Sequence, residues 1–289
     1  LQKKFPADRI LAFEKGFAGR TLALASVTDK AAYREGLPRT LAVDYLPFYH
    51  PEEGEASTER TMRRLNEFLH RYPGQHALLI LEVIQGEAGF SSATPAFFQA
   101  VIGRAREAGV LILVDEIQTF GRTTELFAAE QAKIMQLADL ITVGKLTQVC
   151  ATLYRKELQP RPGLLSQTFT GATAAFYGAR SVLRELLEGN YYGPHGRIAE
   201  LAARVGERLS RLPALSEIRI FGSMVSFVVG KGEALQIREL VQDLYRRGLI
   251  CFTAGSDPLR IRFLLPAGGL SDDDLEQGLR ILAEAVQSP

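Results

Sequence analysis

The chain has 289 residues, of which 46% are hydrophobic and 23% are charged, and these proportions are typical of a globular protein. Its formal net charge is only +1 and its basic residues are spread along the chain, which argues against a surface that binds nucleic acid or anionic lipid. Two cysteines and four histidines without metal-ligand spacing argue against a disulfide framework and a structural metal, and no apolar run approaches the roughly 18–20 residues of a membrane span. We therefore expect a cytoplasmic protein with neither a membrane nor a nucleic-acid partner.

Short apolar runs rich in Ile, Leu and Val predict buried strands in the first part of the chain. These runs are residues 10–13, 77–83, 110–114 and 140–143. Residues 95–109 carry apolar side chains at helical spacing, so they form a helix between the second and third strands. This βαβ succession predicts an α/β fold with a mostly parallel sheet flanked by helices. The charged or Pro-rich stretches 51–60 and 157–163 predict surface loops.

The pattern changes after residue 190, where helices alternate with short strands. The expected helices are 198–205 and 235–247, and the expected strands are 218–221, 225–229, 250–252 and 259–264. Ser271 with Asp274 resembles a capping box that opens a last helix ending near Val286. We expect a large domain over residues 1–190 and a smaller α+β domain over residues 191–289.

Lys145 is the only charged residue between Asp139 and the end of the apolar stretch at Tyr154. An ammonium that leaves the end of a buried strand is unfavourable unless it is neutralised or used, and desolvation turns such an amine into a Schiff-base nucleophile. The alternative is a lysine whose side chain simply reaches solvent from the strand end.

Asp115 ends the apolar strand at 110–114, where open α/β sheets gather their ligand-binding groups. A carboxylate at this place can keep a pyridine nitrogen protonated, which strengthens the ring as an electron sink. The alternative is a helix N-cap or a salt-bridge partner, both common roles for an aspartate at the end of a strand.

Several motifs occur in a specific order along the chain. Residues 13–21 read Phe-Glu-Lys-Gly-Phe-Ala-Gly-Arg-Thr, residues 81–89 read Leu-Glu-Val-Ile-Gln-Gly-Glu-Ala-Gly, and residues 114–123 read Val-Asp-Glu-Ile-Gln-Thr-Phe-Gly-Arg-Thr. Gly144-Lys145 and Thr168-Phe169 follow. Together they resemble the class III aminotransferases, pyridoxal 5′-phosphate (PLP) enzymes of fold type I that include ornithine, acetylornithine, 4-aminobutyrate and lysine 6-aminotransferases. The resemblance runs essentially from end to end.

The resemblance implies a set of PLP-binding residues. Lys145 would hold the cofactor as a Schiff base, and Asp115 would pair with the pyridinium nitrogen. Phe17 would lie against one face of the ring, and Gln118 would donate toward the phenolic oxygen. Thr168 would bind the cofactor phosphate of a neighbouring subunit, which implies a homodimer or a higher oligomer. Lys145 and Asp115 would be the catalytic residues.

The resemblance also implies three substrate-binding residues. Arg20 and Arg262 match the arginines that bind substrate carboxylates, and their planar guanidinium groups suit bidentate contacts. Glu87 matches the acid that pairs with the second arginine while an ω-amine donor is bound and releases it when a dicarboxylic oxo acid enters. Without the resemblance, Arg262 is equally well a surface residue of a strand and Glu87 an acid in a turn.

The sequence departs from the family at several places. The family carries a segment before the position of Leu1, with a glycine-rich turn that binds the cofactor phosphate, and this sequence lacks it. The expected fold is therefore fold type I without its N-terminal part. Ala18 stands where His is frequent, Val83 where Pro is usual, and residues 170–173 read Thr-Gly-Ala-Thr instead of Gly-Gly-Asn-Pro.

The function that the resemblance implies is transfer of an amino group from an ω-amine such as lysine, ornithine or 4-aminobutyrate to 2-oxoglutarate, with PLP as the cofactor. One alternative is another reaction on the same fold, as in an aminomutase, a racemase or a decarboxylase. A second alternative is a non-catalytic homologue that serves as a subunit or scaffold, because the phosphate-binding turn is missing and residues 170–173 are altered.

Overall fold

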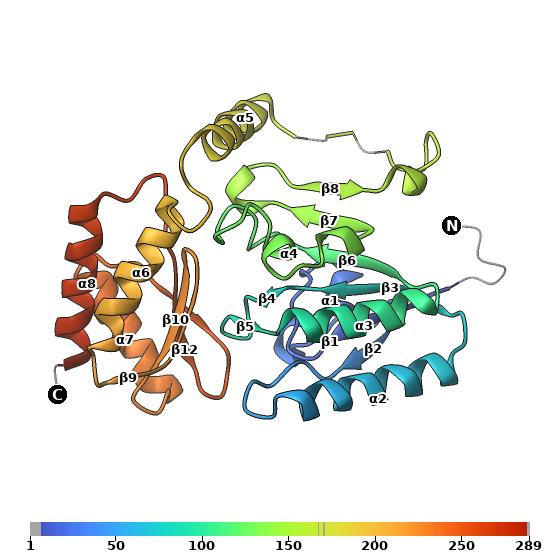
Figure 1. The fold of residues 1–289 in the computed structure, drawn as a ribbon, viewed down its shortest axis with the longest axis horizontal. Coiled ribbons are helices and arrows are strands. Elements are labelled where there is room, and N and C mark those ends of the chain that lie inside the picture. Colours follow the sequence, from blue (N-terminus) through green and yellow to red (C-terminus); the bar gives the residue numbers. More distant parts are fainter. Residues whose placement is uncertain (1–6, 167, 170, 288–289) are drawn as a thin grey trace. The chain divides into compact units, whose positions relative to one another are not determined.

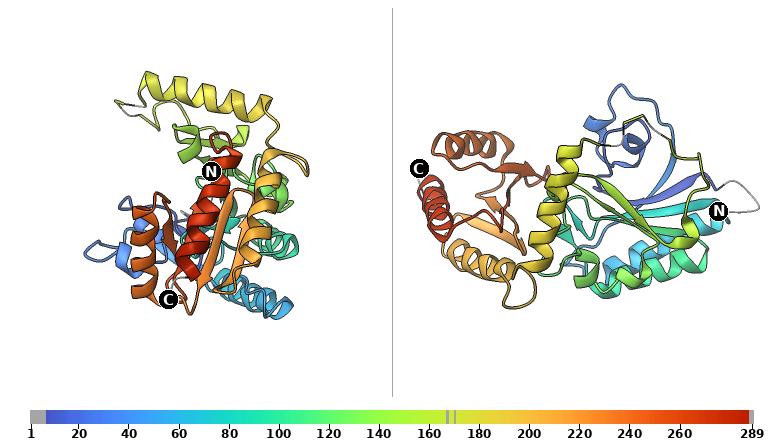
Figure 2. Two further views of the ribbon diagram at one scale, coloured as in Figure 1. Left: turned by 90° about the vertical axis from the view of Figure 1, so that its left-hand side faces the viewer. Right: turned by 90° about the horizontal axis from the view of Figure 1, so that it is seen from above.

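The computed structural model describes residues 7–166, 168–169 and 171–287, which form two compact units (Figures 1 and 2). The first unit comprises Leu1–Ile84, Ser92–Phe120 and Phe127–Glu188, and the second comprises Gln85–Ser91, Gly121–Leu126 and Gly189–Pro289. Two short segments from the first half of the chain therefore belong to the same unit as its C-terminal part.

The first unit contains a six-stranded sheet in the order β2-β1-β3-β6-β7-β8. Its strands are β1 (Arg9–Phe13), β2 (Ala42–Leu46), β3 (His76–Leu81), β6 (Leu111–Asp115), β7 (Leu140–Val143) and β8 (Ala151–Tyr154). The five strands β2, β1, β3, β6 and β7 pair in parallel in this order, whereas β8 is antiparallel to β7. The predicted parallel sheet is confirmed, and β2 and β8 are strands that the sequence patterns did not predict. Because β1, β3, β6 and β7 are parallel, the loops after their carboxyl ends lie along one edge of the sheet.

Helices accompany this sheet. They are α1 (Leu24–Val27), α2 (Glu55–Arg71), α3 (Pro95–Glu107), α4 (Ala128–Gln131) and α5 (Thr173–Glu188), with short 3-10 turns η1 (Ala31–Tyr33), η2 (Met135–Leu137), η3 (Lys145–Thr147) and η4 (Lys156–Leu158). The predicted crossover helix is α3, which lies beside α2 on one face of the sheet (Figure 2). Its start is defined by Thr94, whose hydroxyl accepts a hydrogen bond from the Phe97 N–H at 3.2 Å, and by Pro95 in the first turn.

The loop predicted at 51–60 is wrong for residues 55–60, because α2 begins at Glu55, whereas residues 51–54 form a turn. The buried face of this helix includes two hydroxyl side chains, Ser57 and Thr61, so its inner stripe does not read as apolar in the sequence. The Thr61 hydroxyl donates to the Pro47 carbonyl at 2.9 Å, and the Ser57 hydroxyl accepts from the His50 N–H at 2.9 Å. These bonds satisfy polar groups that would otherwise be buried without partners.

The second unit contains a four-stranded antiparallel sheet in the order β11-β12-β10-β9. Its elements are α6 (Arg197–Ser210), β9 (Leu215–Phe221), β10 (Met224–Val229), α7 (Ala234–Arg246), β11 (Phe252–Ala254), β12 (Arg260–Leu264) and α8 (Asp272–Gln287). The predicted α+β pattern is confirmed here. At the start of α8 the Ser271 hydroxyl accepts a hydrogen bond from the Asp274 N–H at 3.1 Å, as the capping motif predicted.

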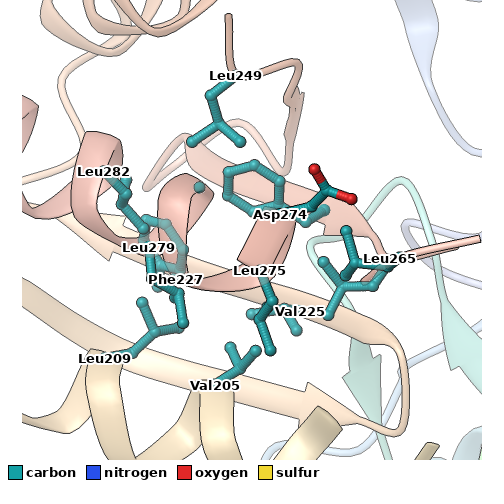
Figure 3. A pocket seen from close by; sticks show the side chains of 13 residues that line it. Val205, Leu209, Val225, Phe227, Leu249, Leu265, Asp274, Leu275, Leu279 and Leu282 are labelled. Atoms are coloured by element: carbon teal, nitrogen blue, oxygen red, sulfur yellow. The ribbon is translucent and has the colours of Figure 1, made fainter. Parts of the chain in front are cut away.

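The core of the second unit contains a small apolar cavity of about 80 Å³ (Figure 3). Side chains from α6, α8 and the sheet converge on it, among them Val205, Phe227, Leu275 and Leu279. Gly278 of α8 also lines this cavity. A Cβ at this position would lie 3.4 Å from Leu249 Cδ1, an ordinary van der Waals contact, so the site has room for a methyl group.

A short two-stranded sheet, β4 (Ile84–Gln85) with β5 (Ser91–Ser92), brackets the turn at 86–90.

Within the described residues, no helix has the length and apolar character needed to cross a membrane. The same residues contain no group of three or more His, Cys, Asp or Glu side chains that could hold a metal ion.

Candidate active site

Asp115 is the last residue of β6, and one of its carboxylate oxygens is held by two hydrogen bonds. The Ile117 N–H donates to Oδ1 at 2.9 Å and the Thr142 hydroxyl donates to the same atom at 3.1 Å. Burial raises the pKa of Asp115 above its usual value, although these hydrogen bonds and the charge of Lys145 lower it in part. Among the residues that the structure describes, no donor reaches Oδ2, so this oxygen is available to a ligand.

Lys145 comes directly after Gly144 at the end of β7, the strand that pairs in parallel with β6. Its φ of 51° lies in the left-handed region, which residues other than glycine rarely adopt, and such strain persists where the surrounding structure enforces it. The charge of Lys145 lowers the pKa of Asp115 in part, and both residues stand at the carboxyl ends of adjacent parallel strands. The residue is exposed in this chain, so the chain by itself does not desolvate the amine.

Gly144 is required by the packing around Lys145. A Cβ at this position would lie 2.8 Å from Cys150 Sγ and 2.8 Å from Ile117 Cδ1, closer than such atoms approach in folded proteins. The backbone before the lysine is therefore packed tightly against the segment that follows Asp115.

Phe17 and Arg20 lie in the turn after β1. The Phe17 N–H donates to Glu82 Oε1 at 2.9 Å, which ties this turn to the residue after β3. The half-buried Phe17 ring contacts the Tyr33 ring edge to face, with centroids 5.9 Å apart, and the Arg20 guanidinium lies 3.9 Å over the same Tyr33 ring. Two predicted site residues thus share a contact that the sequence did not indicate.

Gln118 is half-buried in a segment anchored by its neighbour Glu116. The fully buried Glu116 carboxylate accepts hydrogen bonds from the Ala128 N–H at 3.1 Å and the Ala129 N–H at 2.7 Å, and a short one from the Thr119 hydroxyl. Burial raises the pKa of Glu116, and these hydrogen bonds lower it in part. This buried acid therefore connects the segment that carries Gln118 to the start of α4.

Thr168 lies in the exposed stretch between η4 and α5. Within the described residues it forms no hydrogen bond, to Asp115 and Lys145 or to any other residue. The neighbouring Phe169 side chain is 73% exposed. Thr168 and Phe169 therefore both present their side chains to solvent in this chain.

Glu87 and Arg262 form an ion pair within the second unit. The Arg262 guanidinium donates to Glu87 Oε1 at 2.8 Å and to the Gly86 carbonyl at 2.9 Å. The Arg262 side chain is 13% exposed and the Glu87 side chain is 23% exposed. The pair expected from the motifs is therefore made, with Arg262 on β12 and Glu87 in the turn between β4 and β5.

The turn that carries Glu87 is also held by polar side chains of the four-stranded sheet of the second unit. Arg219 and Ser226 both donate to the Gly89 carbonyl at 3.0 Å. Arg260 is almost fully buried, bonds to Glu217, and lies so close to Gly89 that a Cβ there would collide with it. These contacts fix the position from which Glu87 reaches Arg262.

The predicted residues thus fall into separate groups. The first unit brings together Asp115 and Lys145 at adjacent strand ends, and it places Phe17, Arg20 and Gln118 in loops along the same edge of the sheet. Thr168 belongs to this unit but lies outside the group, and Glu87 and Arg262 pair within the second unit. Sequence reasoning missed Tyr33, Glu116, Arg219 and Arg260. The only signal for Glu116 was an acid directly after the strand-ending Asp115.

Curated relatives match nearly the whole chain. It is 29% identical to 5-aminovalerate aminotransferase of Pseudomonas aeruginosa over 304 residues, covering 95% of this chain and 68% of the relative. It is 27% identical to acetylornithine aminotransferase of Listeria innocua over 289 residues, covering 97% and 69%. The chain thus spans about two thirds of the length of these relatives.

Solved structures show the same fold. Lysine aminotransferase from M. tuberculosis superposes with a TM-score of 0.86 at 24% identity, covering 97% of this chain and 66% of that one. Ornithine aminotransferase from Toxoplasma gondii superposes with a TM-score of 0.83 at 22% identity, covering 99% and 66%. The predicted fold class is therefore confirmed. Because the aminotransferase class-III family model matches residues 2–286, the chain belongs to the class III aminotransferases.

Proposed function

We propose that this chain serves PLP-dependent transfer of an amino group from an ω-amine donor to 2-oxoglutarate. The observation that carries the proposal is that Asp115 and Lys145 stand at the carboxyl ends of adjacent parallel strands, where the charge of the amine lowers the pKa of the carboxyl group in part. The names of relatives that act on 5-aminovalerate, acetylornithine and 4-aminobutyrate support a donor with a terminal amine and a carboxylate.

The residues of the first unit fit PLP, the cofactor of this family. Asp115 keeps Oδ1 in two protein hydrogen bonds and leaves Oδ2 for a protonated ring nitrogen. Lys145 follows the neighbouring strand β7 and is exposed, so its amine can react with an aldehyde. Phe17 offers an apolar ring in the loop after β1, and Gln118 offers an amide in the loop after β6.

PLP, when bound, supplies an electron sink that makes the hydrogen on the amine-bearing carbon of the substrate acidic. The chain's own residues do the rest. Lys145 would anchor the cofactor covalently and, once released, accept the proton from that carbon and return one as general acid. Asp115 would hold the proton at the ring nitrogen, where its negative charge stabilises charge that develops during the reaction.

Three residues would select the substrates. Arg20 has its guanidinium held flat on a ring and would bind a carboxylate shared by donor and acceptor. Arg262 is paired with Glu87, which neutralises it while a donor with no second carboxylate is bound. A dicarboxylic oxo acid would displace Glu87 and take its place on the arginine. This exchange at Arg262 would let the chain accept two unlike substrates.

The second copy of this chain is the partner that we propose. Every residue of the edge strand β8 is exposed, although two of the four are Leu153 and Tyr154. The segment that follows exposes Leu165 at 77% and Phe169 at 73%. Exposed edges and apolar patches of this kind are normally covered by a partner. Thr168 lies in this segment, so a homodimer would carry it toward the cofactor phosphate of the neighbouring subunit.

The proposal is tested by a donor screen with PLP and 2-oxoglutarate, read out as glutamate formation. The donors are 4-aminobutyrate, 5-aminovalerate, ornithine, acetylornithine and lysine. Borohydride reduction followed by peptide mass spectrometry should locate PLP on Lys145. We expect Lys145→Ala to abolish turnover and trapping, whereas Lys133→Ala, the matched control at another exposed lysine with a left-handed φ, leaves both unchanged.

The screen also separates the other reactions of the same fold. An aminomutase, racemase or decarboxylase would convert the donor into a product that keeps its amino group, without forming glutamate. That result would overturn the transfer reaction but keep the cofactor assignment. Turnover that survives in Lys145→Ala would overturn both. If no PLP is trapped on Lys145 and no donor reacts, the chain acts as a non-catalytic subunit or scaffold.

We also propose a cytoplasmic location. Cys150 and Cys251 are free cysteines, which fits the reducing conditions there.

A further inference from the structure

The turn that carries Phe17 and Arg20 is bonded to a second segment farther along the chain. The Ala18 N–H donates to the Thr28 hydroxyl at 3.0 Å, and that hydroxyl donates to the Gly19 carbonyl at 2.8 Å. Thr28 is fully buried. The Lys15 N–H donates to Asp29 Oδ2 at 2.9 Å, and the Asp29 N–H donates to the Gly16 carbonyl at 2.9 Å. Residues 15–19 and 28–29 therefore form one rigid base.

Tyr33 is carried directly by this base, in the 3-10 turn η1. Its ring receives the Arg20 guanidinium at 3.9 Å from the centroid on its face, and it contacts the Phe17 ring at an interplanar angle of 85°. The Lys30 ammonium lies 4.6 Å from the ring centroid and donates to the Tyr33 hydroxyl at 3.2 Å. One half-buried ring thus touches both the expected cofactor-stacking residue and an expected substrate arginine.

A guanidinium stacked on an aromatic face keeps its N–H groups free, because these donors point outward in the plane of the group. Arg20 is exposed, and an unsupported arginine would lose most of its side-chain freedom on binding a carboxylate. Stacking on Tyr33 restricts that freedom before the ligand arrives and still leaves the bidentate edge available.

We propose that Tyr33 is a positioning residue of the candidate site, whose ring holds the Arg20 guanidinium in the orientation that receives a substrate carboxylate. The inference rests on the proposed function, in which Arg20 binds that carboxylate. It assigns to the η1 turn a part in substrate affinity, and the Tyr33 ring rather than its hydroxyl carries the effect. Because the Tyr33 ring also contacts Phe17, we expect it to have a smaller effect on the cofactor as well.

The test compares Tyr33→Leu, Tyr33→Met and Tyr33→Phe in the PLP-loaded protein. Calorimetry measures binding of glutarate, a dicarboxylate that cannot react, and steady-state kinetics give KM and kcat for 2-oxoglutarate. We expect Leu and Met to weaken glutarate binding and raise KM by roughly 3- to 30-fold with little change in kcat, from the strength of a cation–π contact. Phe keeps the ring and should stay within about twofold of wild type.

A matched control exists elsewhere in the same unit. Arg9 lies 3.7 Å over the ring of Tyr72, next to the amino end of β1 and therefore at the opposite edge of the sheet from the candidate site. Tyr72→Leu removes an equivalent stack and should leave glutarate affinity and KM unchanged. Met at position 33 preserves apolar bulk, so the comparison survives if the Leu variant does not fold.

The outcomes separate this inference from the proposed function. A loss in Tyr33→Phe as large as in Tyr33→Leu would overturn the role of the ring, and so would unchanged affinity in both Leu and Met variants. The Leu effect should vanish in an Arg20→Ala background, and its persistence there would show that Tyr33 does not act through Arg20. If Arg20→Ala itself leaves glutarate binding unchanged, the carboxylate assignment fails, whatever Tyr33 does.

Discussion

Replacing Asp115 by asparagine separates what this side chain does for the fold from what it does for the cofactor. Both hydrogen bonds to the carboxylate end on Oδ1, and the asparagine carbonyl oxygen can accept the same two bonds from Ile117 and Thr142. Only the charge and the second oxygen are lost. The variant therefore keeps the local geometry and exchanges an acceptor for an N–H donor where the ring nitrogen would lie.

The two expected effects of Asp115→Asn have opposite signs. Burial raises the pKa of Asp115 above the usual value of an aspartate, so the fold favours the protonated carboxyl. The stability that this preference contributes is complete below the unfolded-state pKa and is lost as the pH rises through the folded-state pKa. Asparagine is never charged, so the apo-protein of the variant should be more stable than wild type at neutral pH. Turnover should fall about 10²- to 10³-fold, as when one preorganised electrostatic group is removed from an active site.

The assay is urea unfolding of the apo-protein from pH 4 to 8. Circular dichroism monitors the unfolding, because the chain contains no tryptophan for a fluorescence signal. The difference in midpoint between variant and wild type should grow as the pH rises from about 4. A variant less stable than wild type at neutral pH, or one with turnover within tenfold of it, would refute the reasoning.

Two further variants test other parts of the structure. Glu87→Gln removes the charge that neutralises Arg262, so we expect a lower KM for 2-oxoglutarate and a slower reaction with monocarboxylate amine donors. Single-turnover kinetics measure the two half-reactions separately. Equal changes in both half-reactions would contradict the proposed exchange of Glu87 for a substrate carboxylate. Gly278→Ala should stabilise the protein by about 1 kcal/mol from helix propensity and up to about 0.8 kcal/mol more from the methyl group that enters the cavity. The control Gly103→Ala, where a Cβ would meet nothing within 4 Å, isolates the propensity contribution in urea unfolding, and equal gains in both variants would show that the cavity is not filled.

The parallel sheet could be predicted because its central strands have no exposed residue and therefore read as nearly unbroken apolar runs. The same reasoning fails at the edges. β8 has the residues Ala-Thr-Leu-Tyr, all exposed in this chain, so neither alternation nor an apolar run marks it. β2 carries Asp44, which is buried only because Arg9 and His76 bond to it from β1 and β3. Such polar partners become visible only after the strands are paired.

The candidate site divides in a similar way. Asp115 and Lys145 could be found because each follows an apolar run at the carboxyl end of a strand, and the parallel order then makes them neighbours. The contact between Arg20 and Tyr33 left no trace in the sequence, because it depends on hydrogen bonds that fold residues 28–29 back onto the turn after β1. The arginines that hold Gly89 were equally hidden, since alternation along antiparallel strands gives the face of a side chain but not its partner.

The placement of the amine next to the acid depends on backbone packing more than on attraction between their charges. Ile117 acts on both sides: its N–H fixes Asp115 Oδ1, and its side chain lies against Gly144, where it leaves no room for a Cβ. The left-handed φ of Lys145 is then imposed by a backbone that is packed immediately before it. A geometry set in this way does not change when the amine or the carboxyl gains or loses a proton. A catalytic lysine needs this property, because it must change its charge and its covalent state in every cycle while the acid beside it stays in place.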